Sequence, residues 1–392
     1  MKIALYSLNN KVINRLFFIM IAALPFVNKF TKLTVVLFLG AFFRYIYLHK
    51  DFILEKNHQL FLLLFVSLII ITNLNAELMI ANLKTDMYLF FYISIFYATI
   101  YFLQKDILKL STLIYAIVIS MSVYMIDGYF QYNMGYDFLF HNPVVTNGIN
   151  SVSRNRNIFA LASFFYFIVL FYVSFEIKKK PFIIYILLVH AILLILLTLS
   201  RQIWLSMILF LIILLIFNYR YFSFKSILYT LGISTIGMIV LSTIPELQDR
   251  FCDLQQLESS GRTEFWQLLL SHLKDAPLLG HSFQSPINIE GAKQHFVYAH
   301  NLTVDILYAF GLTGFILYII FIAYFLKILF KCNNKKLKPY LLATFIPIIF
   351  IQQQLGGSML VHKFIGPSIM ILLALIVTYC SSDSFIKGKK IK

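Results

Sequence analysis

The chain has 392 residues, of which 60% are hydrophobic and 13% are charged, and it contains 41 Phe and 24 Tyr. Soluble domains are roughly 45–50% apolar and about 25% charged. This composition excludes a cytosolic enzyme, a nucleic-acid-binding domain and a disulfide-stapled secreted domain. The net charge of +16 is therefore interpreted as membrane topology. We expect an all-α polytopic membrane protein in which residues 1–392 form a single integral membrane domain.

About twelve apolar runs are long enough to cross ~30 Å of hydrocarbon as helices. The first run has a charged start but no small-residue cleavage site after it, which predicts an uncleaved span. Three cysteines in so long a chain form no spaced framework, so we expect that disulfides do not hold it together. The cysteines are Cys252, Cys332 and Cys380. The runs begin near Val12, Leu33, Gln59, Met87, Leu110, Asn157, Pro181, Gln202, Phe224, Thr303, Lys338 and Phe364.

Lysines and arginines predict the orientation of these spans. With the N-terminus inside and twelve alternating spans, 22 of the 33 Lys and Arg residues fall in short inner loops and tails. This is the setting in which the positive-inside bias operates. One missed span would reverse all later loops and remove the bias. Both termini are therefore expected in the cytoplasm.

The expected outer face has one medium loop, 127–156, and one long loop, 245–299. Loops of this length are usually functional. Within the long loop, residues 262–273 carry apolar side chains at helical spacing, followed by Pro277 and Gly280. Such an amphipathic helix, with Trp266 on its apolar side, fits the outer membrane interface. The alternative is that it packs on the outer ends of the spans.

Two arginines of the outer face are candidates for anion binding. Arg201 lies between two apolar runs with almost no loop, where a charge costs a few kcal/mol and is usually paired or functional. The alternative is an anchor that fixes the span ends. Arg262 opens the expected interfacial helix, whose N-terminus favours anions. Its alternative is a surface pair with Glu258 or Glu264. Arg154 and Arg156 rank lower, with solvated loop charges as their alternative.

His300 and Asn301 stand at the start of the tenth run. Asn301 fits a helix N-cap, and Asp305 one turn later is a candidate for orienting His300. An imidazole with an unperturbed pKa near 6.5 accepts a proton from a hydroxyl, while arginines bind phosphate oxygens without titrating. Together these residues predict a site for a phosphorylated donor and a hydroxyl acceptor. The histidines at 141, 281, 295 and 362 are interpreted as structural.

This arrangement resembles the O-antigen ligase family, whose superfamily includes the O-antigen polymerases. The resemblance covers roughly 157–330 and departs from the family at Gly280-His281-Ser282, where the family often has Gly-x-Gly. The motifs that carry it are Ser200-Arg201, Ser260-Gly261-Arg262 with Phe265-Trp266, Pro277-Leu-Leu-Gly280, His300-Asn301, and Tyr308-Ala-Phe-Gly-Leu-Thr-Gly314.

The resemblance implies a GT-C-like architecture and a glycosyltransferase of the bacterial inner membrane with a periplasmic site. It implies an undecaprenyl-pyrophosphate-linked glycan as donor and lipid A-core as acceptor. The other expected partners are membrane lipids, and no nucleic acid is expected to bind. Arg201 and Arg262 are expected to bind the pyrophosphate, and His300 to activate the acceptor hydroxyl. Two guanidiniums can neutralise the charge that the leaving group gains, so no metal or other cofactor is expected. Base-assisted attack of the hydroxyl on the anomeric carbon predicts inversion by a single displacement.

Three other functions remain open. An O-antigen polymerase uses the same donor, and the segments around Arg262 and His300 favour the ligase over it. A protein-directed oligosaccharyltransferase usually carries further soluble sequence. A flippase or transporter would place ionisable residues at the membrane midplane, where His190 is the main exception in this chain.

Overall fold

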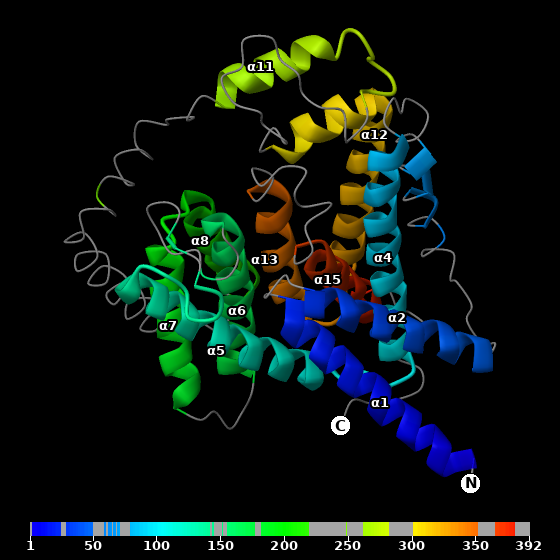
Figure 1. Ribbon diagram of the computed structural model, residues 1–392, viewed down its shortest axis with the longest axis vertical. Coiled ribbons are helices and arrows are strands. Elements are labelled where there is room, and N and C mark those ends of the chain that lie inside the picture. The colour runs from blue at the N-terminus through cyan, green and yellow to red at the C-terminus, as the bar shows by residue number, and fades with distance from the viewer. Residues whose placement is uncertain are drawn as a thin grey trace.

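The computed structural model describes a largely helical chain (Figure 1). The described residues are 2–24, 29–49, 59, 62–64, 66–67, 69–70, 79–141, 143–144, 151, 155–176, 182–218, 248, 262–281, 301–351 and 365–380. The helices are α1 (Lys2–Ala23), α2 (Lys29–His49), α4 (Met79–Gln104), α5 (Leu110–Met134), α6 (Arg156–Glu176), α7 (Ile183–Leu197), α8 (Arg201–Asn218), α11 (Arg262–His272), α12 (Leu302–Phe330), α13 (Leu337–Phe350) and α15 (Ile365–Cys380).

Five of the described helices, α2, α4, α5, α6 and α12, contain segments long and apolar enough to cross a membrane. Four shorter apolar helices, α7, α8, α13 and α15, accompany them. The polytopic helical class agrees with the sequence prediction. The number of twelve spans stays a prediction, because the run near Phe224 lies outside the described residues and the run near Gln59 lies largely outside them.

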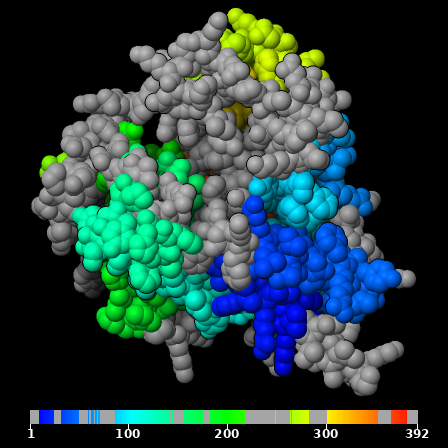
Figure 2. All heavy atoms as spheres, viewed as in Figure 1, coloured from blue at the N-terminus to red at the C-terminus, as the bar shows by residue number. Residues whose placement is uncertain are grey.

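The outward side of α5 shows why the chain needs lipid around it. Tyr115, Ile119, Val123 and Ile126 are exposed and follow one another at helical spacing. The opposite side of α5, which includes Tyr124, is buried in the bundle. Figure 2 shows α5, in teal, on the surface of the molecule. An exposed apolar stripe on a buried helix fits hydrocarbon rather than water.

Aromatic packing holds α6 against α8. The ring of Phe210 on α8 lies 6.0, 5.7 and 5.8 Å from the rings of Phe164, Phe167 and Phe171 on α6. Offset and edge-to-face rings at this separation attract one another beyond the gain from burying their area. The two helices are therefore fixed side by side, which matters below because each begins with an arginine.

The medium loop predicted for residues 127–156 begins later than the sequence suggested. α5 continues past Asp127 to Met134 and ends at Gly135, whose φ of 79° closes the helix. Asp127 is buried and accepts hydrogen bonds from Leu139 N (3.1 Å) and the Ser151 hydroxyl. Ser151 N donates to Gln131 Oε1 at 2.6 Å. The side chains of Asp127 and Gln131 can be buried because residues that follow α5 supply their hydrogen-bond partners.

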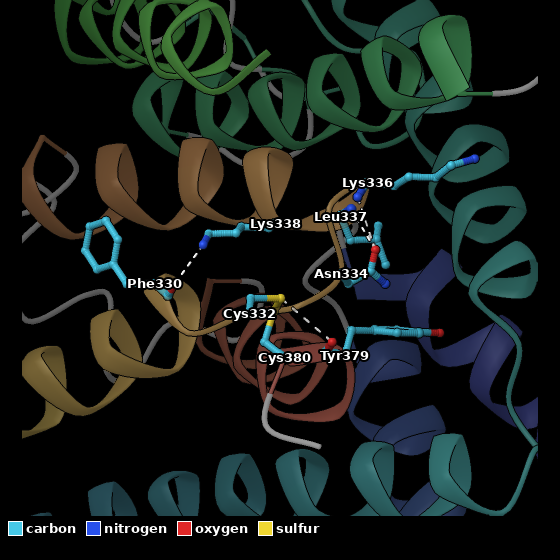
Figure 3. Close-up of a disulfide and its surroundings, with 8 residues drawn as sticks. All are labelled: Phe330, Cys332, Asn334, Lys336, Leu337, Lys338, Tyr379 and Cys380. Atoms are coloured by element: carbon cyan, nitrogen blue, oxygen red, sulfur yellow. Dashed lines mark hydrogen bonds between the residues drawn. A yellow bond between two sulfur atoms is a disulfide. The ribbon is translucent and has the colours of Figure 1, made fainter. Parts of the chain in front are cut away.

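One pair of cysteines forms a disulfide, although the spacing of the three cysteines predicts no disulfide framework. Cys332, just after α12, and Cys380, the last residue of α15, form a disulfide (Figure 3). They are 48 residues apart in sequence, so no spacing rule pairs them. They meet because α12 and α15 pack together and end at the same place. Beside them, Lys338 Nζ donates to Phe330 O at 2.6 Å and closes the end of α12.

Candidate functional site

α11 packs across the beginning of α12 (Figure 1). Leu269 of α11 and Val304 of α12 are buried against each other, and Phe265, Trp266 and Tyr308 surround them. The helix ends at His272, within one residue of the expected 262–273. Its predicted apolar side is thus covered by α12, which supports the packing alternative, while Leu270 of the expected stripe is exposed.

Asn301 caps α12 as the sequence predicted. Its Oδ1 accepts hydrogen bonds from Thr303 N (3.0 Å) and Val304 N (3.3 Å). Asp305 lies one turn later, buried, and its amide donates to Asn301 O at 2.9 Å. The cap fixes the point at which α12 begins.

The turn after α11 inserts into a break in α12. Gly311 has φ 61° and ψ −161°, which interrupts the helix. The usual bond from Leu312 N to Tyr308 O is opened, and both groups find partners in the turn. Leu312 N donates to Pro277 O at 2.9 Å, and Tyr308 O accepts from His281 N at 2.8 Å. Backbone freed within a span must be satisfied in this way.

Two glycines make this insertion sterically feasible. A Cβ on Gly280 would lie 2.5 Å from Gly311 N, and a Cβ on Gly311 would lie 2.5 Å from Leu278 O. Both glycines also have positive φ, 71° and 61°. Any other residue at either position would force the two backbones apart.

The contact between Gly280 and Gly311 forms a joint between α11 and α12. His281, where the chain departs from the Gly-x-Gly pattern, is part of this joint. Its ring stacks on Tyr308 with centroids 5.0 Å apart, and its Nε2 donates to His272 O at 2.8 Å. The side chain thus links the end of α11 to α12. This agrees with the interpretation of His281 as a structural residue.

α6 and α8 begin next to each other. Ser200, just before α8, donates through its hydroxyl to Asn157 Oδ1 on α6 at 3.0 Å. Arg156 is the first residue of α6 and Arg201 the first residue of α8, and both side chains are half-buried. The structure therefore brings the starts of α6 and α8 together, each with an arginine, although their positions in the sequence are far apart.

A tight turn joins α7 to α8. Leu199 has φ 52°, which is unfavourable for a leucine. Thr198 Oγ1 and Trp204 Nε1 both donate to Ile195 O, at 2.7 and 3.1 Å. Only three residues therefore separate the end of α7 at Leu197 from Arg201 at the start of α8, as the sequence suggested.

The remaining predicted site residues are placed only in part. Arg262 is the first residue of α11, and His300 and Arg154 lie outside the described residues. His190, the candidate midplane residue, has a partner, since its Nδ1 lies 3.1 Å from Tyr129 Oη. Sequence reasoning gave no separate role to Asn157 or Gly311, because both act through contacts with distant segments. Within the described part of the chain, no cluster of three His, Cys, Asp or Glu residues could hold a metal ion.

Residues 184–319, about a third of the chain, match the model of the O-antigen ligase family. All five motifs on which the resemblance rested lie inside this segment. No curated protein shows a significant sequence match to the chain. Residues 184–319 are therefore similar to the O-antigen ligase family, and the resemblance is confirmed for these residues. Arg154, Arg156 and Asn157 lie before the matched segment.

Proposed function

We propose, starting from the O-antigen ligase domain at residues 184–319, that the protein moves O-antigen glycan from undecaprenyl pyrophosphate onto a sugar hydroxyl of lipid A-core. The reaction takes place at the periplasmic face of the bacterial inner membrane. The observation that carries the proposal is that Arg201 and Arg262 each open a helix within this domain. A guanidinium beside a helix N-terminus suits an anionic donor.

The proposed chemistry is a single displacement at the anomeric carbon of the donor. The acceptor oxygen forms the new bond to that carbon while the bond to the pyrophosphate oxygen breaks. His300 takes the proton of the acceptor hydroxyl, and the electron pair leaves with the pyrophosphate. Arg201 and Arg262 stabilise the charge that the leaving group gains. Attack from the face opposite the leaving group inverts the anomeric configuration, and no metal ion or other cofactor is required.

The local structure supports this division of roles. The cap at Asn301 fixes the chain immediately after His300, and the joint between Gly280 and Gly311 ties α11 to the same span. The end of α11, the helix that Arg262 opens, and the start of α12, which follows His300 in the sequence, are therefore both held on one span. Arg154, Arg156, Asn301 and Asp305 are proposed as secondary contacts to the donor or to an anionic core.

The test is transfer by the purified protein from undecaprenyl-pyrophosphate glycan to lipid A-core, read as a mass increase of the acceptor. Glycan on lipid A-core is the expected result. Lengthening of the lipid-linked glycan with an untouched core would instead establish the polymerase. Movement of intact donor across vesicles without any transfer would indicate a flippase. Loss of activity with a chelator would contradict the metal-free mechanism.

Substitutions test the three proposed residues. Arg201→Ala, Arg262→Ala and His300→Ala are each expected to abolish transfer at unchanged membrane expression. Arg262→Lys should restore little activity, because lysine does not bind phosphate bidentately. Arg44→Ala, an exposed arginine of α2, is the matched control and should retain activity. Full activity of His300→Ala would remove the histidine from the mechanism.

A further inference from the structure

We infer that Asn157 is a positioning residue for Arg201 and acts through the hydroxyl of Ser200. The inference rests on the proposed role of Arg201 as a ligand of the donor's pyrophosphate. It adds a residue from α6, a helix that lies before the segment matched by the family model.

The contact joins two helices at their first turns. Ser200 Oγ donates to Asn157 Oδ1 at 3.0 Å, and Ser200 is only 3% exposed. A hydrogen bond shielded from water is stronger than one at the surface, and losing one partner leaves the other group unsatisfied. The backbone O of Ser200 also accepts from Ile203 N (3.1 Å) and Trp204 N (3.3 Å). The same residue therefore starts α8 and attaches it to α6.

The turn before Ser200 has an unfavourable backbone conformation, which this attachment helps to hold. Leu199 is held at φ 52° although it is buried and not a glycine. Such a backbone is strained for a residue with a Cβ and persists only where surrounding contacts impose it. The bonds to Ile195 O hold the turn within the α7–α8 pair. The bond to Asn157 attaches the turn to α6 through a side chain.

Arg201 follows Ser200 directly, so a shift of Ser200 moves the guanidinium with it. A planar guanidinium binds two phosphate oxygens at once only in a narrow range of orientations. Displacements of about 1 Å at such groups are costly for function. Removing the Asn157–Ser200 bond should therefore weaken donor binding without removing any group that touches the donor.

The experiment measures the Kd of undecaprenyl diphosphate for the full-length protein in detergent micelles. Asn157→Ala and Ser200→Ala should each raise the Kd about five- to tenfold, and the double variant should be no weaker than either single variant. In an Arg201→Ala background, Asn157→Ala should change nothing further. Ser163→Ala is the matched control, because Ser163 is buried in α6 and, among the described residues, its hydroxyl bonds within its own helix, to Phe159 O. Its Kd should stay at the wild-type value.

The outcomes separate the two proposals. A wild-type protein that does not bind undecaprenyl diphosphate would contradict the proposed function itself. Wild-type affinity in Asn157→Ala, or a further fivefold loss when it is added to Arg201→Ala, would overturn the positioning role alone. Should Asn157→Ala not reach the membrane, Ser200→Thr decides instead. It keeps the hydroxyl and should bind as the wild type does, while equal weakening in Ser200→Thr and Ser200→Ala would refute the inference.

Discussion

Gly280 and Gly311 occupy positions where a single added methyl group changes the molecule. Both have positive φ, and in each case a Cβ would lie 2.5 Å from backbone of the other segment. Backbone cannot move aside as a flexible side chain can. Gly311 moreover has ψ −161°, a region that is essentially restricted to glycine. At these two residues, therefore, both the positive φ and the close approach of the other backbone require glycine.

Gly311→Ala is therefore expected to destabilise the protein by at least about 2 kcal/mol. Two other glycines separate the contributions. Gly135→Ala has positive φ but open space around it and should cost about 1 kcal/mol. Gly40→Ala lies within α2 with open space and should be neutral or slightly stabilising. Thermal unfolding in detergent measures all three. A Gly311→Ala protein as stable as Gly135→Ala would show that the two backbones can separate freely.

Asn301 combines a capping role with a place beside the proposed base. Asn301→Ala removes the acceptor of two backbone amides and should cost about 1 kcal/mol. Asn301→Ser restores a capping oxygen and should recover that stability. Transfer activity measured on the same variants tells the two roles apart. Activity that recovers with stability assigns Asn301 to capping, whereas an Asn301→Ser protein that is stable but inactive assigns it to the substrate.

At the scale of the element, α11 depends on one buried residue. Leu269 is 1% exposed against α12, while the next residue, Leu270, is 41% exposed. Leu269→Ala should cost about 2–3 kcal/mol in the docking of α11, and Leu270→Ala less than about 0.5 kcal/mol. The rate of amide hydrogen exchange in residues 262–272 measures how stably α11 is docked on α12. Faster exchange is expected in Leu269→Ala only. Equal exchange in both variants would mean that α11 is held in some other way.

Local signals explain which elements could be predicted from the sequence. The apolar period and Pro277 placed α11 to within one residue, and Asn301 before an apolar run gave the cap of α12. The contacts between distant segments had no such signal. Asn157 reaches Ser200, and Cys332 reaches Cys380, only because whole helices pack side by side. The proposed positioning role of Asn157 had no signal in the sequence for the same reason.

At the scale of the molecule, the orientation predicted from the lysines can be tested at three exposed positions. Lys105 follows α4, Lys274 lies between α11 and α12, and Lys335 lies between α12 and α13. α12 is interrupted at Gly311, where the turn that follows Lys274 contacts it. The straight part of the helix from Leu312 to Phe330 spans about 28 Å, close to the thickness of the hydrocarbon core, so Lys274 and Lys335 are expected on opposite faces. With both termini inside, Lys105 and Lys335 face the cytoplasm and Lys274 faces the periplasm.

The position of Lys274 relative to Lys105 depends on the run near Phe224. Helices α5, α6, α7 and α8 lie between the two lysines, and four crossings would return the chain to the same face. A fifth crossing near Phe224 places Lys274 outside, as required for α11 to carry periplasmic chemistry.

The three lysines are replaced one at a time by cysteine in a chain whose Cys252, Cys332 and Cys380 are serine, and spheroplasts are treated with a membrane-impermeant maleimide. Lys274→Cys should react in intact spheroplasts, and Lys105→Cys and Lys335→Cys only after permeabilisation. If Lys105→Cys and Lys274→Cys react from the same side, the run near Phe224 does not cross, and Arg262 cannot share a periplasmic site with Arg201.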